Sequence, residues 1–383
     1  MKKRTARPAS RTRRAAARRP VSRPSHRSAS SRVAAGRGTN NRARPGNGER
    51  RAGELARASA KALVPNRLST ELAIFTGTAN PALAKAICAE LKVQLSDCLV
   101  GRFSEGEIRV KINENVRGKD IFIVQPTCPP PNDTLMELLI LLDAMRRASA
   151  RRITAVIPYY GYARQDRKDQ PRVPITAKLV ANLITTAGAG RVLTMDLHAG
   201  QIQGFFDIPL DHLYAINVFE SYIRQKKLKP LVVVSPDVGG IKMARAYAKR
   251  LNAGLAIVDK RRATPDATEV VHILGEVQGK ICLLVDDLIA TGSSIMEAAR
   301  ALKQAGAKGI YAAITHPVLS GRAVEMLTAS PIQELLVTDT IPLTKERRHP
   351  KLAVLSVAPL LAEAIRRIHY EQSISSLFDG VHA

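Results

Sequence analysis

ICLLVDDLIATGSSIMEAARALKQAG, residues 281–306, is the stretch that decides the fold class of this 383-residue chain. Its short apolar run predicts a buried strand that ends at Val285 and places Asp286 and Asp287 at the edge of a sheet. The loop ATGSS, residues 290–294, comes next, and an amphipathic helix begins at Ile295. Strand, polar loop and helix in this order predict one βα unit of a parallel sheet.

The same alternation extends in both directions along the chain. Other apolar runs predict strands: LAIF (72–75), DIFIV (120–124), ITAVI (153–157), RVLTM (191–195), LVVV (231–234), LAIV (255–258) and IYAAI (310–314). Between them lie amphipathic segments such as PALAKAICAELK (81–92) and IKMARAYAKRLN (241–252). Such a pattern predicts an α/β fold with helices on both faces of mainly parallel sheets. Because the body is long for a single sheet, we expect two α/β domains, 67–214 and 215–383, with the last segment packing back on the first domain.

Most of the positive charge lies in one terminal segment. The chain has 59 Lys and Arg and 33 Asp and Glu, a net charge of +26. Residues 1–68 hold 20 basic and 2 acidic residues, a net of +18, which leaves +8 for the rest. Residues 1–66 contain almost no large apolar side chains, so we expect a disordered Arg-rich extension. A solvated tail, an organelle transit peptide and a nucleic-acid-binding arm all remain open for it.

Composition also excludes several classes of protein. No run approaches the ~20 apolar residues that a membrane span needs. The four cysteines are far apart and lack C-x-x-C spacing, which argues against a zinc site or disulfide framework and favours the cytoplasm. Neither G-x-x-x-x-G-K-[ST] nor a G-x-G-x-x-G after a strand occurs, which argues against P-loop kinases and nicotinamide enzymes.

Five of the predicted strands lead into segments rich in phosphate and metal ligands. These segments are PYYGYARQDRK (158–168), DLHAGQ (196–201), SPDVGG (235–240), DKRR (259–262) and DDLIATGSS (286–294). Ligands of open α/β sheets bind beyond the carboxyl ends of the strands. Five such ends together predict an active site for a polyanionic substrate.

The segment DDLIATGSS suits a phosphorylated sugar. Gly292 permits a tight turn, and the loop amides with the helix N-terminus form a site for a phosphate. Asp286 and Asp287 would then accept hydrogen bonds from sugar hydroxyls. The alternative is an ordinary N-capped helix after a buried strand, which leaves the paired acids without a role.

Candidate cation sites and basic segments follow other strands. Asp196, His198 and Asp237 are candidates for binding a divalent cation, although Mg²⁺ prefers oxygen ligands and a histidine here can equally be structural. The basic run DKRR could close over phosphates and neutralise negative charge in a transition state. A solvated surface is the alternative for that run and for RQDRK (164–168).

Longer stretches occur in one order along the body: GRFSEGE, MELLILLDAMRRASA, IPYYGYARQDRK, PITAKLVANLI, TMDLHAGQIQGFFDIP, VSPDVGG, IVDKRR, THPVLSG and PLLAEAIRRIHYEQSISSLF. From near Leu72 to the C-terminus the chain thereby resembles the ribose-phosphate pyrophosphokinase family. The resemblance implies two phosphoribosyltransferase-like domains with an active site between domains and subunits. It also implies transfer of the diphosphoryl group of ATP to the anomeric hydroxyl of ribose 5-phosphate, which yields AMP and phosphoribosyl diphosphate for nucleotide biosynthesis.

The resemblance assigns roles residue by residue. It implies ATP contacts for Phe103, Glu105, Gly106, Glu107, Arg164 and Gln165, with the residues of FSEGE reaching the adenine across a subunit interface. It implies Mg²⁺ at His198 and Asp237, and catalytic cations at Lys260 and Arg262, of which Arg262 also touches the sugar phosphate. For ribose 5-phosphate it implies contacts from Asp286, Ala290, Thr291, Gly292, Ser293 and Ser294. A dimer-based homo-oligomer, a hexamer in many members, and regulation by ADP and phosphate complete these expectations.

Two other functions stay open at this point. A purine phosphoribosyltransferase shares the acidic strand end and the phosphate loop, but FSEGE and ARQDRK would have no role in a reaction without ATP. A catalytically silent homologue that binds partner synthetases is the second, and the intact KRR segment argues against it.

Overall fold

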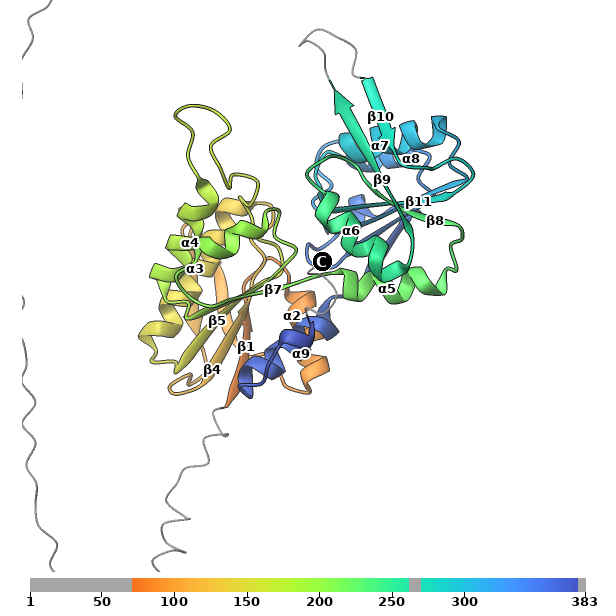
Figure 1. Ribbon diagram of the computed structural model, residues 1–383. Helices are drawn as coiled ribbons and strands as arrows, with labels where there is room; N and C mark the ends of the chain where they lie inside the picture. Colours follow the sequence, from red (N-terminus) through yellow and green to blue (C-terminus); the bar gives the residue numbers. More distant parts are fainter. Residues whose placement is uncertain (1–70, 262–269, 378–383) are drawn as a thin grey trace, which may run out of the picture. The chain divides into compact units, whose positions relative to one another are not determined.

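The structure is a computed structural model that describes residues 71–261 and 270–377 (Figure 1). The predicted disordered extension, residues 1–66, lies outside these ranges. The described residues belong to one compact unit. Within the described ranges, no helix is both long and apolar enough to cross a bilayer.

The first sheet has five parallel strands. In spatial order they are β1 (Leu72–Thr76), β4 (Asp120–Val124), β5 (Arg152–Ile157), β6 (Arg191–Met195) and β7 (Leu210–Leu213). Successive side chains of a strand point to opposite faces of its sheet. Ile74 accordingly packs with α2 (Pro81–Leu91) in one apolar cluster, whereas Phe75 packs with α3 (Pro131–Arg147) and α4 (Thr176–Ala187) in another. Both faces are therefore covered, as the continuous apolar strands predict.

A two-stranded hairpin lies beside this sheet. It consists of β2 (Cys98–Arg102) and β3 (Ile108–Ile112), which pair antiparallel. Alternating half-buried and exposed residues in β3 place one face against α3, because Val110 and Ile112 pack on the cluster that α3 joins. The hairpin thus carries its turn, residues 103–107, on an exposed tip.

The second sheet contains seven strands within the described residues. Their order is β10 (Val270–Leu274), β9 (Gly254–Arg261), β8 (Leu231–Ser235), β11 (Ile281–Ile289), β12 (Gly309–Pro317), β13 (Glu334–Thr338) and β14 (Leu352–Leu355). All pairs are parallel except β10 with β9. Helices α5 (Ile216–Gln225) and α6 (Ile241–Leu251) pack in one cluster, and α7 (Ser293–Gln304) and α8 (Ala323–Thr328) in the other.

The last helix, α9 (Ala358–His369), lies beside α2 (Figure 1). Its apolar residues Leu361 and Ile365 join the cluster that contains Leu83 and Ile87 of α2. The Arg366 guanidinium also donates to the carbonyl oxygen of Glu90 at 3.3 Å. Short 3₁₀ turns complete the described structure at Gly200–Phe205, Lys345–Arg347 and Ser375–Leu377.

The predicted α/β class with parallel sheets is confirmed, and each apolar run predicted as a strand lies within one. The expected end of the strand at Val285 is wrong, because β11 continues to Ile289. Its pairing with β8 stops at Leu284, but its pairing with β12 continues to Ile289. One neighbour is enough to keep the strand extended. Asp286 and Asp287 therefore lie inside the strand, beyond the end of β8.

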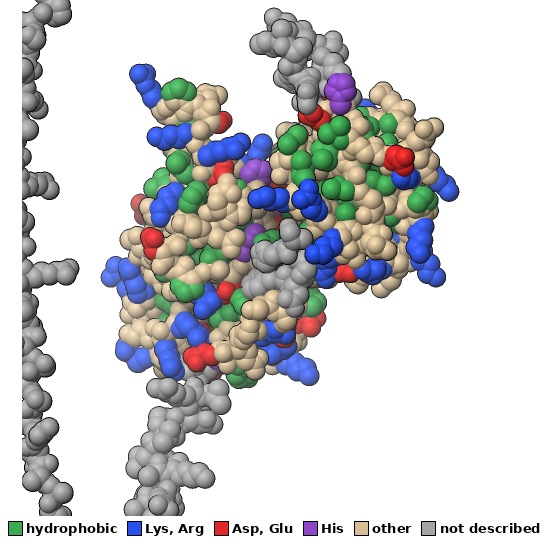
Figure 2. Space-filling model, in the orientation of Figure 1, with side chains coloured by type: hydrophobic (Ala, Val, Ile, Leu, Met, Phe, Trp, Pro, Cys, Tyr) green, Lys and Arg blue, Asp and Glu red, His purple; other side chains and the backbone are tan. Residues whose placement is uncertain are grey.

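Lys and Arg side chains are spread over the face of the molecule that Figure 2 shows, rather than gathered in one patch. This distribution agrees with the small excess of +8 in the body after the basic tail is subtracted. The visible face therefore offers no continuous basic track of the kind that follows a nucleic-acid backbone.

Candidate active site

The ends of two strands from different sheets meet through a histidine and an aspartate. His198 follows β6, and Asp287 belongs to the extension of β11; His198 Nδ1 lies 2.9 Å from Asp287 Oδ2. A carboxylate can only accept, so the ring donates through Nδ1 and its Nε2 carries the lone pair in the neutral form. The Asp287 side chain is buried and His198 is partly exposed, so this pair opens to solvent on the histidine side.

The two adjacent aspartates differ in charge. Burial raises the pKa of Asp286 well above its usual value, and the neighbouring charges of Asp287 and Asp237 raise it further. Burial also acts to raise the pKa of Asp287, but the hydrogen bond and positive charge of His198 outweigh it and lower that pKa. In turn, the hydrogen bond from Asp287 raises the pKa of His198 despite its partial burial. The site therefore keeps an ionised Asp287 beside an Asp286 that readily holds a proton.

The loop from Ala290 to Ser294 leads directly from β11 into α7. Gly292 is the residue before the helix and has φ +83°, in the left-handed region that glycine adopts without strain. The helix begins at Ser293, two residues earlier than predicted, and the Thr291 and Ser293 hydroxyls lie 3.3 Å apart. The amides of the first turn thus follow the acidic strand end, which is an arrangement that binds a phosphate group.

Asp237 follows β8 and is exposed. Its Oδ1 accepts a hydrogen bond from the Gly240 amide at 3.0 Å, which fixes the carboxylate over the turn into α6. Its charge reaches Asp286, as the raised pKa of Asp286 shows. Among residues 71–261 and 270–377, no three His, Cys, Asp or Glu side chains form a ready cage for a metal ion.

The donors nevertheless fit a cation that keeps most of its own water. Mg²⁺ commonly takes one or two carboxylates from the protein and its remaining ligands from water and substrate phosphates. Asp237 offers such a carboxylate. His198 donates to Asp287 through Nδ1, which leaves Nε2 as a ligand atom in the carboxylate–histidine–metal pattern.

Arg164 and Gln165 lie in the segment after β5 and are exposed. His198 lies in the segment after β6, the parallel neighbour of β5, and the positive charge of Arg164 acts to lower the pKa of His198. Gln165 is held at the start of α4, where its carbonyl oxygen accepts from the Ala177 amide at 3.1 Å and its side chain accepts from Thr176. The structure thus brings Arg164 to the edge of the sheet where His198 lies.

The hairpin tip carries Phe103, Glu105, Gly106 and Glu107. Its turn is closed by hydrogen bonds from the Phe103 amide to Glu107 O at 2.8 Å and from the Gly106 amide to Phe103 O at 3.0 Å. Gly106 has φ +97°. Phe103 is 46% exposed, which is high for an aromatic ring, and the contacts of the tip hold it to its own hairpin and to α3 rather than to His198. A ring so exposed in one copy of the chain is available to a ligand or to a second copy.

The two predicted catalytic cations are placed only in part. Lys260 lies near the end of β9, paired with Val271 of β10, so the backbone there belongs to the projecting β9–β10 ribbon. Arg262 lies outside the described residues.

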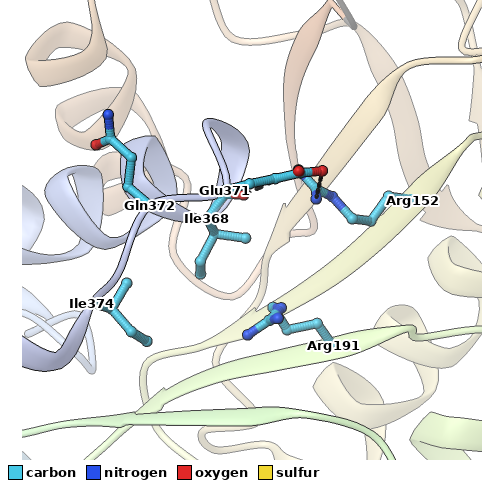
Figure 3. A pocket seen from close by; sticks show the side chains of 6 residues that line it. All are labelled: Arg152, Arg191, Ile368, Glu371, Gln372 and Ile374. Carbon is cyan, nitrogen blue, oxygen red and sulfur yellow. Dashed lines mark hydrogen bonds and ion pairs between the residues drawn. The ribbon is translucent and has the colours of Figure 1, made fainter. Parts of the chain in front are cut away.

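A cavity of about 360 Å³ lies at the amino ends of strands in the first sheet, opposite the carboxyl ends that carry the candidate site (Figure 3). Its arginines, Arg152 and Arg191, are the first residues of β5 and β6, so they lie at the amino ends of strands whose carboxyl ends lead to Arg164 and His198. Each already has an acidic partner, Asp120 for Arg152 and Asp211 for Arg191. This cavity is therefore separate from the candidate active site and has no surplus of positive charge for an anion.

Two buried residues beside the site received no role from the sequence, Thr315 and His316. They follow the predicted strand IYAAI and lie inside β12, which extends to Pro317, and both contact Asp196 of the DLH segment. The signal was available, because polar residues follow this strand as they follow the other five. In the sequence, the stretch THPVLSG (315–321) contributes to the family resemblance and receives no role of its own.

Taken together, the fold and this edge place the chain among α/β proteins that bind phosphorylated ligands beyond the carboxyl ends of parallel strands. Comparison with known proteins identifies the family within this class. The model of the N-terminal domain of ribose phosphate pyrophosphokinase matches residues 72–188, and that of the phosphoribosyl synthetase-associated domain matches residues 261–379.

Relatives match over nearly their full length. The ribose-phosphate pyrophosphokinase of Campylobacter jejuni is 56% identical over 305 residues, which cover 80% of this chain and 98% of the relative. That of Rhodopirellula baltica is 58% identical over 311 residues, with coverage of 80% and 98%. The crystal structure of phosphoribosylpyrophosphate synthetase from Mycobacterium smegmatis superposes with a TM-score of 0.75 at 44% identity, covering 79% of this chain and 99% of that one. The chain belongs to the ribose-phosphate pyrophosphokinase family.

Proposed function

We propose that this site transfers the diphosphoryl group of ATP to the anomeric hydroxyl of ribose 5-phosphate, the reaction of the family to which the chain belongs. The products are AMP and phosphoribosyl diphosphate. The observation that carries the proposal is the 2.9 Å contact between His198 and Asp287. It joins the sheet edge that bears the candidate ATP residue Arg164 to the sheet edge that bears the phosphate loop.

The sugar phosphate binds at the second sheet. The phosphate accepts hydrogen bonds from the amides of residues 291–294, where the N-terminus of α7 also favours negative charge. Asp286 accepts from the sugar hydroxyls, and Ala290 and Thr291 shape the entry to the loop. The raised pKa of Asp286 supports this role, because a partly desolvated carboxyl group gains from hydrogen-bond donors or a cation nearby.

ATP binds at the first sheet and the hairpin. Arg164 and Gln165 contact its phosphates and ribose, and the exposed tip with Phe103, Glu105, Gly106 and Glu107 receives the adenine. The aromatic ring can stack on adenine, and the neighbouring carboxylates can accept hydrogen bonds from its amino group. The exposure of Phe103 supports a contact completed by a second copy of the chain.

Mg²⁺ is the cofactor that the donors fit, held through Asp237 and His198 with the remaining positions left to water and phosphate oxygens. When bound, it neutralises phosphate charge and orients the diphosphoryl group. We expect chelation of divalent cations to abolish AMP formation and added Mg²⁺ to restore it. AMP formed at the full rate in excess chelator would contradict the assignment.

Lys260 and Arg262 supply positive charge to the reacting phosphates. Phosphoryl transfer asks the protein chiefly for positioning and charge stabilisation rather than for covalent chemistry. The two cations stabilise the leaving AMP and the transferred group, and Arg262 also contacts the sugar phosphate. The position of Lys260 on the projecting β9–β10 ribbon supports a segment that closes over bound phosphates.

The wider setting of the enzyme is proposed on the same grounds. The exposed hairpin tip supports a homo-oligomer built from dimers. The expected hexamer and the regulation by ADP and phosphate rest on the resemblance to the family alone. The four free cysteines support a reducing compartment such as the cytoplasm.

The decisive experiment supplies purified protein with ATP, Mg²⁺ and ribose 5-phosphate and no nucleobase. AMP and phosphoribosyl diphosphate should form in equal amounts. A purine phosphoribosyltransferase would make no AMP without a base, and a silent homologue would bind ATP without turnover.

Lys260→Ala then tests the catalytic cation. We expect kcat to fall severely while ribose 5-phosphate binding remains, since the phosphate loop is untouched. Lys249→Ala, which removes an exposed lysine of α6, is the matched control and should keep normal turnover. Near-normal kcat in Lys260→Ala would refute the assignment.

A further inference from the structure

A strained turn connects β6 to His198. Asp196 begins this turn with φ +34°, a positive angle that is uncommon for residues other than glycine. Asp196 is 4% exposed, so the strained residue is also buried. Backbone in such a conformation persists only where surrounding contacts hold it.

Those contacts come from both sheets, and on the first sheet the Asp196 amide donates to Leu213 O of β7 at 3.0 Å. Asp196 Oδ2 accepts from the Thr315 hydroxyl at 2.6 Å and from the Ala215 amide at 3.0 Å. Thr315 lies in β12, more than a hundred residues away along the chain. One hydroxyl group of β12 therefore ties the first residue of the turn that carries His198 to the second sheet.

His316, the next residue of β12, holds the backbone of the same turn. Its Nε2 lies 3.2 Å from both Met195 O and Asp196 O. Carbonyl oxygens only accept, so Nε2 must carry the proton and Nδ1 must accept from the Thr340 hydroxyl at 2.9 Å. These partners define one tautomer and one ring orientation, and they leave the ring no atom for a substrate.

β12 also holds the other end of the His198–Asp287 contact. In the parallel ladder, Asp286 pairs with Ile314 and Leu288 with His316, so Asp287 lies beside Thr315 in register. The strand thus fixes Asp287 through its backbone and the His198 turn through two side chains. A shift of Thr315 or His316 would change the distance across the site.

We propose that Thr315 and His316 are positioning residues, which hold the Asp196–His198 turn against β12 so that His198 faces Asp287. The proposal rests on the proposed function for its catalytic consequence, and on geometry alone for its structural one. Neither residue touches substrate; each acts through His198, and they set the separation between the ATP side and the sugar-phosphate side.

Thr315→Val is the test, because valine keeps the shape of threonine and removes the hydroxyl. Thr315→Ser, which restores a hydroxyl, is the rescue. Thr194→Val is the matched control: Thr194 is also fully buried, lies in β6 two residues before Asp196, and donates to Ile157 O at 2.8 Å within the first sheet. Both valine variants lose one buried hydrogen bond, but only Thr315→Val releases the turn.

We expect Thr315→Val to lower kcat by tenfold to a hundredfold, since misplacement of about 1 Å can cost about a hundredfold in rate. The KM for ribose 5-phosphate should change less than twofold, because the phosphate loop is not involved. Thr315→Ser should recover most of the rate. Thr194→Val should match Thr315→Val in loss of thermal stability but retain kcat.

Crystal structures of the two valine variants give a readout independent of turnover. The 2.9 Å contact between His198 Nδ1 and Asp287 Oδ2 should be broken in Thr315→Val and kept in Thr194→Val. A contact that persists in Thr315→Val, or equal kcat in the two variants, would overturn the proposal. If the wild-type chain makes no AMP, the proposed function fails, and the structures still decide the inference. If Thr315→Val does not fold, Thr340→Val, which loosens the His316 ring, carries the same two expectations.

Discussion

The buried His316 should make the stability of this protein depend on pH between about 4 and 6.5. Burial lowers the pKa of His316 from its ordinary 6.5 to about 4, against the opposing charge of Asp287 and the hydrogen bonds to Asp196 O and Met195 O. The folded protein therefore keeps the ring neutral while the unfolded chain takes up a proton. Between these two values the unfolded state binds more protons, so stability rises with pH and falls on acidification.

The size of the effect follows from the two pKa values. A shift of one unit corresponds to about 1.4 kcal/mol. With values of 6.5 and about 4, linkage gives a loss of about 2 kcal/mol on going from neutral pH to pH 5 and about 3 kcal/mol at pH 4. No loss from this residue should be seen above pH 7.

Urea denaturation at half-unit steps from pH 4.5 to 7.5 measures the effect when the wild type is compared with His316→Gln. Other groups titrate in both proteins and cancel in the difference at each pH. We expect the variant to be less stable at pH 7.5 and the gap to narrow by about 2 kcal/mol on reaching pH 5. Parallel curves, with a constant gap at every pH, would refute the reasoning, because they would mean that His316 titrates alike in the folded and unfolded chain.

Two further predictions concern the fold. Asp120→Asn should lower the free energy of unfolding by on the order of 3 kcal/mol in urea denaturation, since the buried carboxylate accepts from an arginine of β5 and a histidine of α9, each at 2.8 Å. The exposed Asp143→Asn should change it far less, and an equal effect would show that burial is irrelevant. Gly292→Ala should cost about 1 kcal/mol in stability and raise the KM for ribose 5-phosphate, because φ is +83° there although the nearest atoms leave room at 3.6 Å. Gly101→Ala, with open space around it, is the control. Equal KM values for ribose 5-phosphate in the two variants would show that the loop does not bind the sugar phosphate.

Local pattern predicted the parts of this fold that burial controls. Continuous apolar runs and amphipathic segments placed the central strands and helices, because each buries a face whose period is visible in the sequence. The predictions missed β2, β3, β7, β10, β13 and β14. Each of these has only four or five residues, and its pairing partners decide its structure more than its own residues do.

In the candidate site, residues that are contiguous in the sequence could be predicted, and residues brought together by packing could not. The phosphate loop could be read from the sequence, since Gly292, its hydroxyl neighbours and the paired acids are contiguous. The pairing of His198 with Asp287 could not, because 89 residues separate them and only the packing of two sheets brings them within 2.9 Å. Thr315 and His316 were passed over for the same reason: their partners lie in another sheet.

The packing of α9 against α2 has a consequence for how this polypeptide is made. The first sheet is synthesised early, but one side of α2 is sealed by Leu361 and Ile365, and Arg152 donates to Ile368 O near the far end of the chain. Until the ribosome has released α9, the apolar surface of α2 that faces it stays uncovered. A premature stop codon before α9 would therefore leave α2 and the first sheet without this cover.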